Sequence, residues 1–128
     1  MARLWIMMAA ANGFIAVAAG AFGAHALKSR MEARLLEVFE VGVRYQMYHS
    51  LALLAAAWMM TQHPSRWATG SAWCFLLGIV IFSGSLYALS LTGVRWLGAI
   101  TPVGGVLFLA GWILLGVAAS AMRHVPAS

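Results

Sequence analysis

Two of the four histidines lie within long apolar runs, where an ionisable side chain is costly unless it is paired. His25 stands near the end of the first run, and His49 lies in the string RYQMYHS, residues 44–50, which opens the second. An imidazole can move a proton, ligate a metal ion or bond a backbone carbonyl. The residues around each histidine decide which of these functions is possible.

The sequence offers these histidines no carboxylate that would complete a metal site or a catalytic site. The two histidines could ligate a haem axially or hold copper with Met47, but no carboxylate lies inside any apolar run. A pair of His49 with Ser83 or Ser85 would still need a carboxylate to orient the imidazole. We therefore predict no catalytic residue, no metal site, no cofactor and no enzymatic activity.

The composition is that of a membrane protein. The hydrophobic set makes up 63% of the 128 residues, charged residues only 9%, and the mean hydropathy is +0.88. A soluble domain of this length needs more charge to cover its surface. The net charge of +5 comes from basic residues between the apolar runs, where they meet anionic lipid head groups. We expect the lipid bilayer, and no nucleic acid, as the partner.

Four apolar runs are each long enough to cross a membrane. At 1.5 Å per residue they reach roughly 27–37 Å, against a hydrocarbon core of about 30 Å. The last three are joined by short links, which makes them antiparallel neighbours. The sequence predicts an all-α fold, an integral membrane four-helix bundle in one domain, with spans at about 4–27, 45–62, 70–92 and 98–122.

The connection between the first two runs, residues 28–44, is amphipathic. At 100° per residue its charged side chains fall on one face and its apolar side chains on the other. We predict an in-plane helix over 28–44, with Arg30 and Arg34 among the anionic head groups. The alternative is that the second helix begins early and projects from the membrane.

Most intramembrane polar residues belong to one leaflet, because the first and third helices end on the side where the second and fourth begin. Such asymmetry is typical of a polar cavity that opens to one side. The alternative is a purely structural role, in which histidines near helix ends bond backbone carbonyls and serines bond the preceding turn of their own helix. The candidate cavity residues are His25, Arg44, Tyr45, Tyr48, His49, Ser83, Ser85, Tyr87 and Thr101.

Small residues recur at helix-packing intervals, as in Ala16, Gly20 and Ala24. In lipid, such faces let backbones approach closely. They could close the bundle or form a homo-oligomer or larger membrane complex. The candidate packing residues are Gly20, Gly23, Gly84, Gly104 and Gly105.

Four strings occur in order along nearly the whole chain: GAFGAHAL, RYQMYHSLALL, FSGSLYAL and ITPVGG, the last followed by GW. Together they resemble the small membrane proteins of domain of unknown function 423, which include transmembrane protein 256-like proteins of animals. The resemblance implies a multi-pass, four-helix protein of the bacterial inner (plasma) membrane. It implies no established activity.

Two functions remain open. The first hypothesis is a helix-packing accessory or scaffold subunit. The second is a small oligomeric channel or transporter for protons or a small solute, gated through His25, Arg44 and His49. A water-accessible cavity around these residues would favour transport, whereas filling by neighbouring side chains would favour a scaffold.

Overall fold

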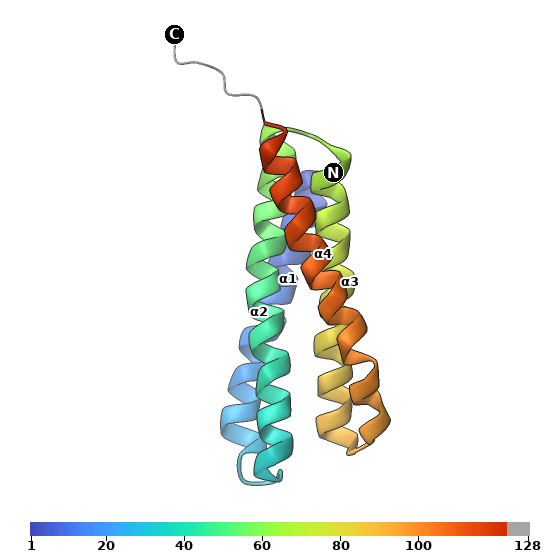
Figure 1. Cartoon of the computed structure of the whole chain (residues 1–128). Coiled ribbons are helices and arrows are strands. Elements are labelled where there is room, and N and C mark those ends of the chain that lie inside the picture. Colours follow the sequence, from blue (N-terminus) through green and yellow to red (C-terminus); the bar gives the residue numbers. More distant parts are fainter. Residues whose placement is uncertain (123–128) are drawn as a thin grey trace.

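The computed structural model describes residues 1–122, and every regular element in that range is helical (Figure 1). This confirms the predicted all-α, four-helix fold. The elements in chain order are α1 (Ala2–Phe22), the π-helical turn η1 (Gly23–Leu27), α2 (Ala33–Gln62), α3 (Arg66–Thr92), the 3-10 turn η2 (Arg95–Ala99) and α4 (Thr101–Ser120).

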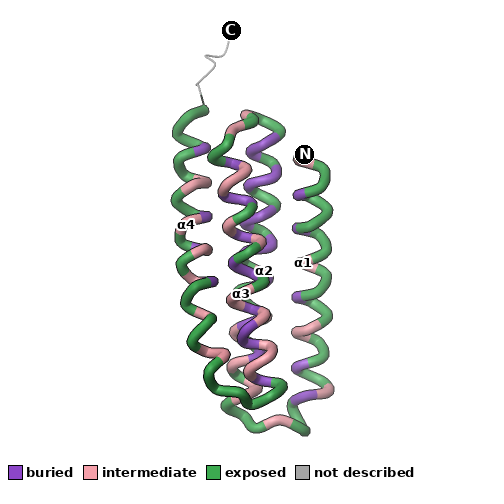
Figure 2. The backbone as a smooth tube through the Cα atoms, turned by 90° about the vertical axis from the view of Figure 1, so that its right-hand side faces the viewer, coloured by how far each residue is buried: buried purple, intermediate pink, exposed green. Residues whose placement is uncertain are grey.

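The helices do not form a square bundle. In Figure 2, α2 and α3 lie in the middle, with α1 on one side and α4 on the other. The main packing interfaces are α1 on α2, α2 on α3 and α3 on α4. Polar side chains on α2 and α3 can therefore be buried by helices on both sides.

Three segments are long and apolar enough to cross a membrane: Ala2–Leu27, Arg66–Thr92 and Arg95–Ser120. α2 is not among them, because Gln46, His49 and Ser50 interrupt its apolar sequence. α2 nevertheless runs beside α1 and α3 along most of their length (Figure 1). The predicted span over residues 45–62 stays a prediction, supported by this side-by-side packing.

The separate in-plane helix expected over residues 28–44 does not form. α2 begins at Ala33 and continues unbroken through Arg44 to Gln62. The apolar face of this segment packs within the protein rather than on acyl chains: Phe39 is 4% exposed, and its ring lies 5.0 Å from that of Tyr87. The alternative, in which the second helix begins early, describes the structure better.

Helix boundaries in the second half follow ordinary capping chemistry. Ser65 precedes α3, and its hydroxyl accepts a hydrogen bond from the Ala68 amide at 3.2 Å. Gly93 ends α3 with φ +74°, a left-handed conformation that favours glycine. Pro102 lies in the first turn of α4, where no helical donor is lost. Pro102 therefore begins α4 and does not break it. A transporter-like half-helix would require such a break.

Candidate functional site

His49 lies in the centre of the protein, between α2, α3 and α4. Its Nδ1 is 2.8 Å from the carbonyl oxygen of Tyr45, and the indole N–H of Trp112 donates to its Nε2 at 3.2 Å. Because Nε2 accepts, it carries no proton, so Nδ1 carries the proton and donates to the carbonyl. The ring is neutral, 5% exposed, and has a partner at each nitrogen.

Aromatic rings enclose the His49 imidazole. It stacks on Phe108 with centroids 3.5 Å apart and planes at 6°, and Phe75 lies 5.8 Å away. Two glycines make room for these rings. A Cβ at Gly78 would lie 2.5 Å from the Phe108 ring, and one at Gly111 would lie 2.7 Å from the Phe75 ring.

A second group of polar contacts joins α1, α2 and α3 through Gln46, which is 4% exposed. The Gln46 Nε2 donates to Asn12 Oδ1 at 3.1 Å, and the Tyr87 hydroxyl donates to Gln46 Oε1 at 2.7 Å. Asn12 in turn donates to the Met8 carbonyl at 2.9 Å. Three helices are thus connected by a chain of amide and phenol hydrogen bonds.

Three of the buried serines also bond between helices, whereas Ser50 and Ser90 bond carbonyls of their own helix. Ser83 donates to the Gly42 carbonyl of α2 at 2.7 Å, and Ser71 donates to the Gly111 carbonyl of α4 at 2.8 Å. Ser85 lies 2.6 Å from the Thr101 hydroxyl at the start of α4. The contacts of Ser83 and Ser71 pair hydroxyls that would otherwise lack a partner in an apolar interior, and Ser85 also bonds the Phe82 carbonyl at 2.9 Å.

The other predicted cavity residues do not join these contacts. His25 and Arg44 are exposed, and Tyr45 and Tyr48 are 39% and 53% exposed. The Tyr45 ring still packs on Phe82, with centroids 4.7 Å apart. Among the predicted residues, His49, Ser83, Ser85, Tyr87 and Thr101 are buried or half-buried hydrogen-bonding groups. They do not form one cavity but lie at three separate places: beside Trp112, beside Gln46 and at the start of α4. Arg30 and Arg34 are exposed, in the α1–α2 connection and the first turn of α2.

The candidate packing glycines differ in how closely they are approached. A Cβ at Gly104 would lie 2.5 Å from the backbone nitrogen of Phe82, one at Gly23 3.0 Å from the Phe39 ring, and one at Gly20 3.3 Å from Val43. Gly105 has ordinary 4.0 Å contacts, and a Cβ at Gly84 would meet nothing within 4 Å.

Gly84 instead lines a groove of about 330 Å³ between α1 and α3. Its polar lining comes from Asn12, Gln46, Ser83 and Tyr87, whose hydrogen bonds are described above. The remaining lining is apolar, from Ile15, Ile79 and Val80.

Sequence reasoning missed Gln46, Asn12, Phe108, Gly78, Gly111 and Trp112 as members of these clusters. Amides and aromatic rings are not ionisable, so a search for chemistry-bearing side chains passes over them. An amide in the middle of an apolar run was the available signal for Asn12. Within residues 1–122, no three His, Cys, Asp or Glu side chains gather as a metal site would require.

Fold and composition together define a small helical integral membrane protein, whose polar interior consists of hydrogen bonds between helices. The chain belongs to the DUF423 family, described as proteins of unknown function, whose sequence profile matches residues 19–105. This confirms the family predicted from the motifs.

Bacterial relatives are similar over most of their length. The UPF0382 membrane protein SSP2132 of Staphylococcus saprophyticus is 47% identical over 88% of this chain and 93% of its own. The UPF0382 membrane protein YwdK of Bacillus subtilis is 44% identical over 91% of this chain and 96% of its own. The UPF0382 inner membrane protein YgdD of Escherichia coli is 45% identical over 95% of this chain and 93% of its own. These relatives and the three apolar helices confirm the predicted location in a bacterial inner membrane. No solved structure matches the chain.

Proposed function

We propose that this protein is a non-catalytic packing subunit, an accessory or scaffold protein of the membrane, and that its intramembrane polar residues hold its helices together. The role is one of shape: the bundle presents helix faces to other membrane components. Its polar groups give the helices a defined register, which packing of apolar side chains in lipid supplies only weakly.

The observation that supports this role is the saturation of the buried polar side chains. His49, Ser83, Ser85, Tyr87 and Thr101 each have a hydrogen-bond partner within the protein. In the part of the chain that the structure describes, no buried side-chain nitrogen or oxygen lacks a partner. Polar groups that conduct a solute must be free to exchange partners with it, whereas these are held by neighbouring side chains.

The channel alternative has less support. Both nitrogens of His49 are engaged, and Phe108 covers one face of the ring. His25 and Arg44, which were expected to share a cavity with His49, are exposed. The groove beside Gln46 combines saturated polar groups with an apolar lining.

The test is a flux assay on the purified chain in liposomes, with protons and small neutral solutes, beside His49→Ala. We expect no flux above protein-free liposomes for either protein, and a lower unfolding free energy for His49→Ala. The matched control is His25→Ala, which removes an exposed imidazole and should leave stability unchanged. Flux that is present in the unmodified protein and lost in His49→Ala would overturn the packing role.

A further inference from the structure

The outer face of α2, directed away from α3, carries charges next to an apolar and aromatic surface. We define the α2 outer stripe by its members: Glu37, Glu40, Arg44, Tyr48, Leu51 and Trp58. All are exposed, the last three by 53%, 60% and 54%. At 100° per residue they fall within a sector of about 80°, so they form one continuous surface along the helix.

Neighbouring helices show how deep Arg44 lies. Val43, beside it, lies 3.3 Å from a Cβ built at Gly20, and the helical segment formed by α1 and η1 continues from Gly20 to Leu27, a rise of about 10 Å. Tyr45 packs on Phe82, and α3 continues for about another 15 Å before it ends.

The first apolar segment, Ala2–Leu27, has 26 residues and is about 39 Å long. It exceeds a hydrocarbon core of about 30 Å by only about 5 Å at each end. A segment centred on the hydrocarbon core places the Arg44 Cα about 5 Å inside the core, with Glu40 one turn nearer the surface. Exposing such charges to acyl chains is costly, and they are normally paired.

These charges lack partners within the chain. In residues 1–122 the only salt bridge joins Arg34 to Glu32 at 3.8 Å, so Glu37, Glu40 and Arg44 form none. An anionic lipid head group attracted by Arg44 would be repelled by the two carboxylates beside it. A second copy of the stripe carries both signs, and it pairs with the first where the Arg44 side chain reaches one turn along the axis to the partner's Glu40.

Two copies with the same orientation in the membrane are related by a two-fold axis along its normal, so their α2 helices run parallel. Helical side chains lean toward the helix N-terminus. Glu40 leans the same way, but the Arg44 side chain is the longer of the two, so its guanidinium reaches toward the partner's Glu40 carboxylate, and the reciprocal pair forms by symmetry.

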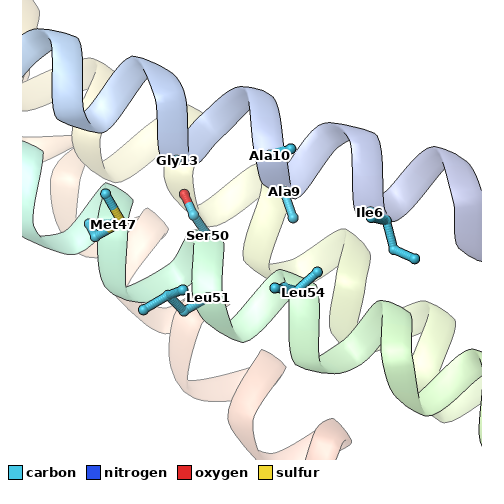
Figure 3. A pocket seen from close by; sticks show the side chains of 8 residues that line it. All are labelled: Ile6, Ala9, Ala10, Gly13, Met47, Ser50, Leu51 and Leu54. Carbon is cyan, nitrogen blue, oxygen red and sulfur yellow. The ribbon is translucent and has the colours of Figure 1, made fainter.

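The apolar half of the stripe borders two hollows on its α1 side. Beside Leu51 and Leu54, a groove of about 200 Å³ lies between α1 and α2, with Ala9 and Gly13 on its α1 side (Figure 3). A neighbouring hollow of about 480 Å³ borders Trp58. The small α1 residues let another helix approach closely, and a second Leu51 and Trp58 lie at the level of these hollows.

We propose that the α2 outer stripe is the contact surface of a parallel two-fold dimer, in which Glu40 of each copy pairs with the partner's Arg44. The inference rests on the proposed packing role and names one of its partners. The two can fail separately, because crosslinking measures the dimer whereas flux and unfolding measure the proposed function.

The experiment uses the full chain with Leu51→Cys in a Cys74→Ala background, reconstituted in bilayers at a low protein-to-lipid ratio and oxidised. We expect a disulfide-linked dimer. Glu40→Arg and Arg44→Glu should each lower the crosslinked fraction about fivefold or more, because each sets like charges together. The double reversal should restore it.

Two matched controls define the background. Val106→Cys, on the exposed face of α4, should crosslink only by random collision, and Arg95→Glu should leave the Leu51→Cys crosslink unchanged. Where a reversal prevents insertion, Glu40→Gln and Arg44→Gln take its place. Each should lower the crosslinked fraction, and the double Gln variant should lower it no further than either alone.

The proposal is overturned by Leu51→Cys crosslinking no better than Val106→Cys, or by a double reversal as low as the single ones. It is also overturned by native mass spectrometry that shows only monomers holding phosphatidylglycerol, with the lipid lost in Arg44→Glu. That result would make the stripe a lipid head-group site.

Discussion

The indole N–H of Trp112 on α4 donates to Nε2 of His49 on α2, across 3.2 Å and 63 positions of sequence. This contact is one of few between α2 and α4, whose main packing partner is α3 in each case. It assigns the imidazole tautomer and connects the two helices through their side chains.

Trp112→Phe should lower the free energy of unfolding by about 1–2 kcal/mol, because it leaves Nε2 of His49 without its donor in a buried position. Denaturation of the reconstituted protein, followed by circular dichroism, measures the change. Adding His49→Phe removes the orphaned acceptor, so Trp112→Phe should cost less in that background. Equal costs in both backgrounds would show that the hydrogen bond contributes nothing.

Nitrogen-15 NMR of histidine-labelled protein in bilayers should show His49 neutral at pH 7, with the proton on Nδ1. The reason is that Nε2 accepts from Trp112 while Nδ1 faces the Tyr45 carbonyl. Trp112→Phe should move the Nε2 resonance far more than the Nδ1 resonance. A proton found on Nε2 would contradict the donor role of the indole.

Gln46→Leu should destabilise the bundle by about 0.6–2 kcal/mol, the range measured for hydrogen bonds between membrane helices. The substitution keeps a similar volume but removes the bonds to Asn12 and Tyr87. Gln62→Leu is the matched control, because Gln62 is exposed and bonds only Thr61. A similar loss in both variants would mean that the contacts to α1 and α3 are not the cause.

Gly104→Ala should disrupt the α3–α4 interface, at a cost of about 1–3 kcal/mol or more. Its Cβ would lie 2.5 Å from the backbone nitrogen of Phe82, and backbone cannot move aside as a side chain can. Gly84→Ala meets nothing within 4 Å and should be neutral. Thermal denaturation of the two variants side by side measures the difference, and equal stability would mean that the helices separate at no cost.

Local hydropathy determined the class of fold and the number and order of the helices. An apolar run of about 20 residues forms a helix in lipid, since only internal hydrogen bonds can satisfy its backbone. The motif strings such as FSGSLYAL were equally local, which is why the family could be predicted before the structure was known.

The amphipathic segment 28–44 shows where local pattern is insufficient. An apolar helix face is equally well covered by acyl chains or by another helix, so its periodicity could not choose between them. Only the packed position of Phe39, between Gly23 of η1 and Tyr87 of α3, decides that residues 33–44 continue α2.

The candidate site was decided by tertiary structure in the same way. The antiparallel order of the helices predicted that His49, Ser83 and Tyr87 share a leaflet. It did not predict that His49 meets Trp112 or that Tyr87 meets Gln46. Those pairings depend on the rotation of each helix about its axis, which is set where Gly78, Gly104 and Gly111 allow close approach. Rotation is a property of facing surfaces, and no single helix sequence contains it.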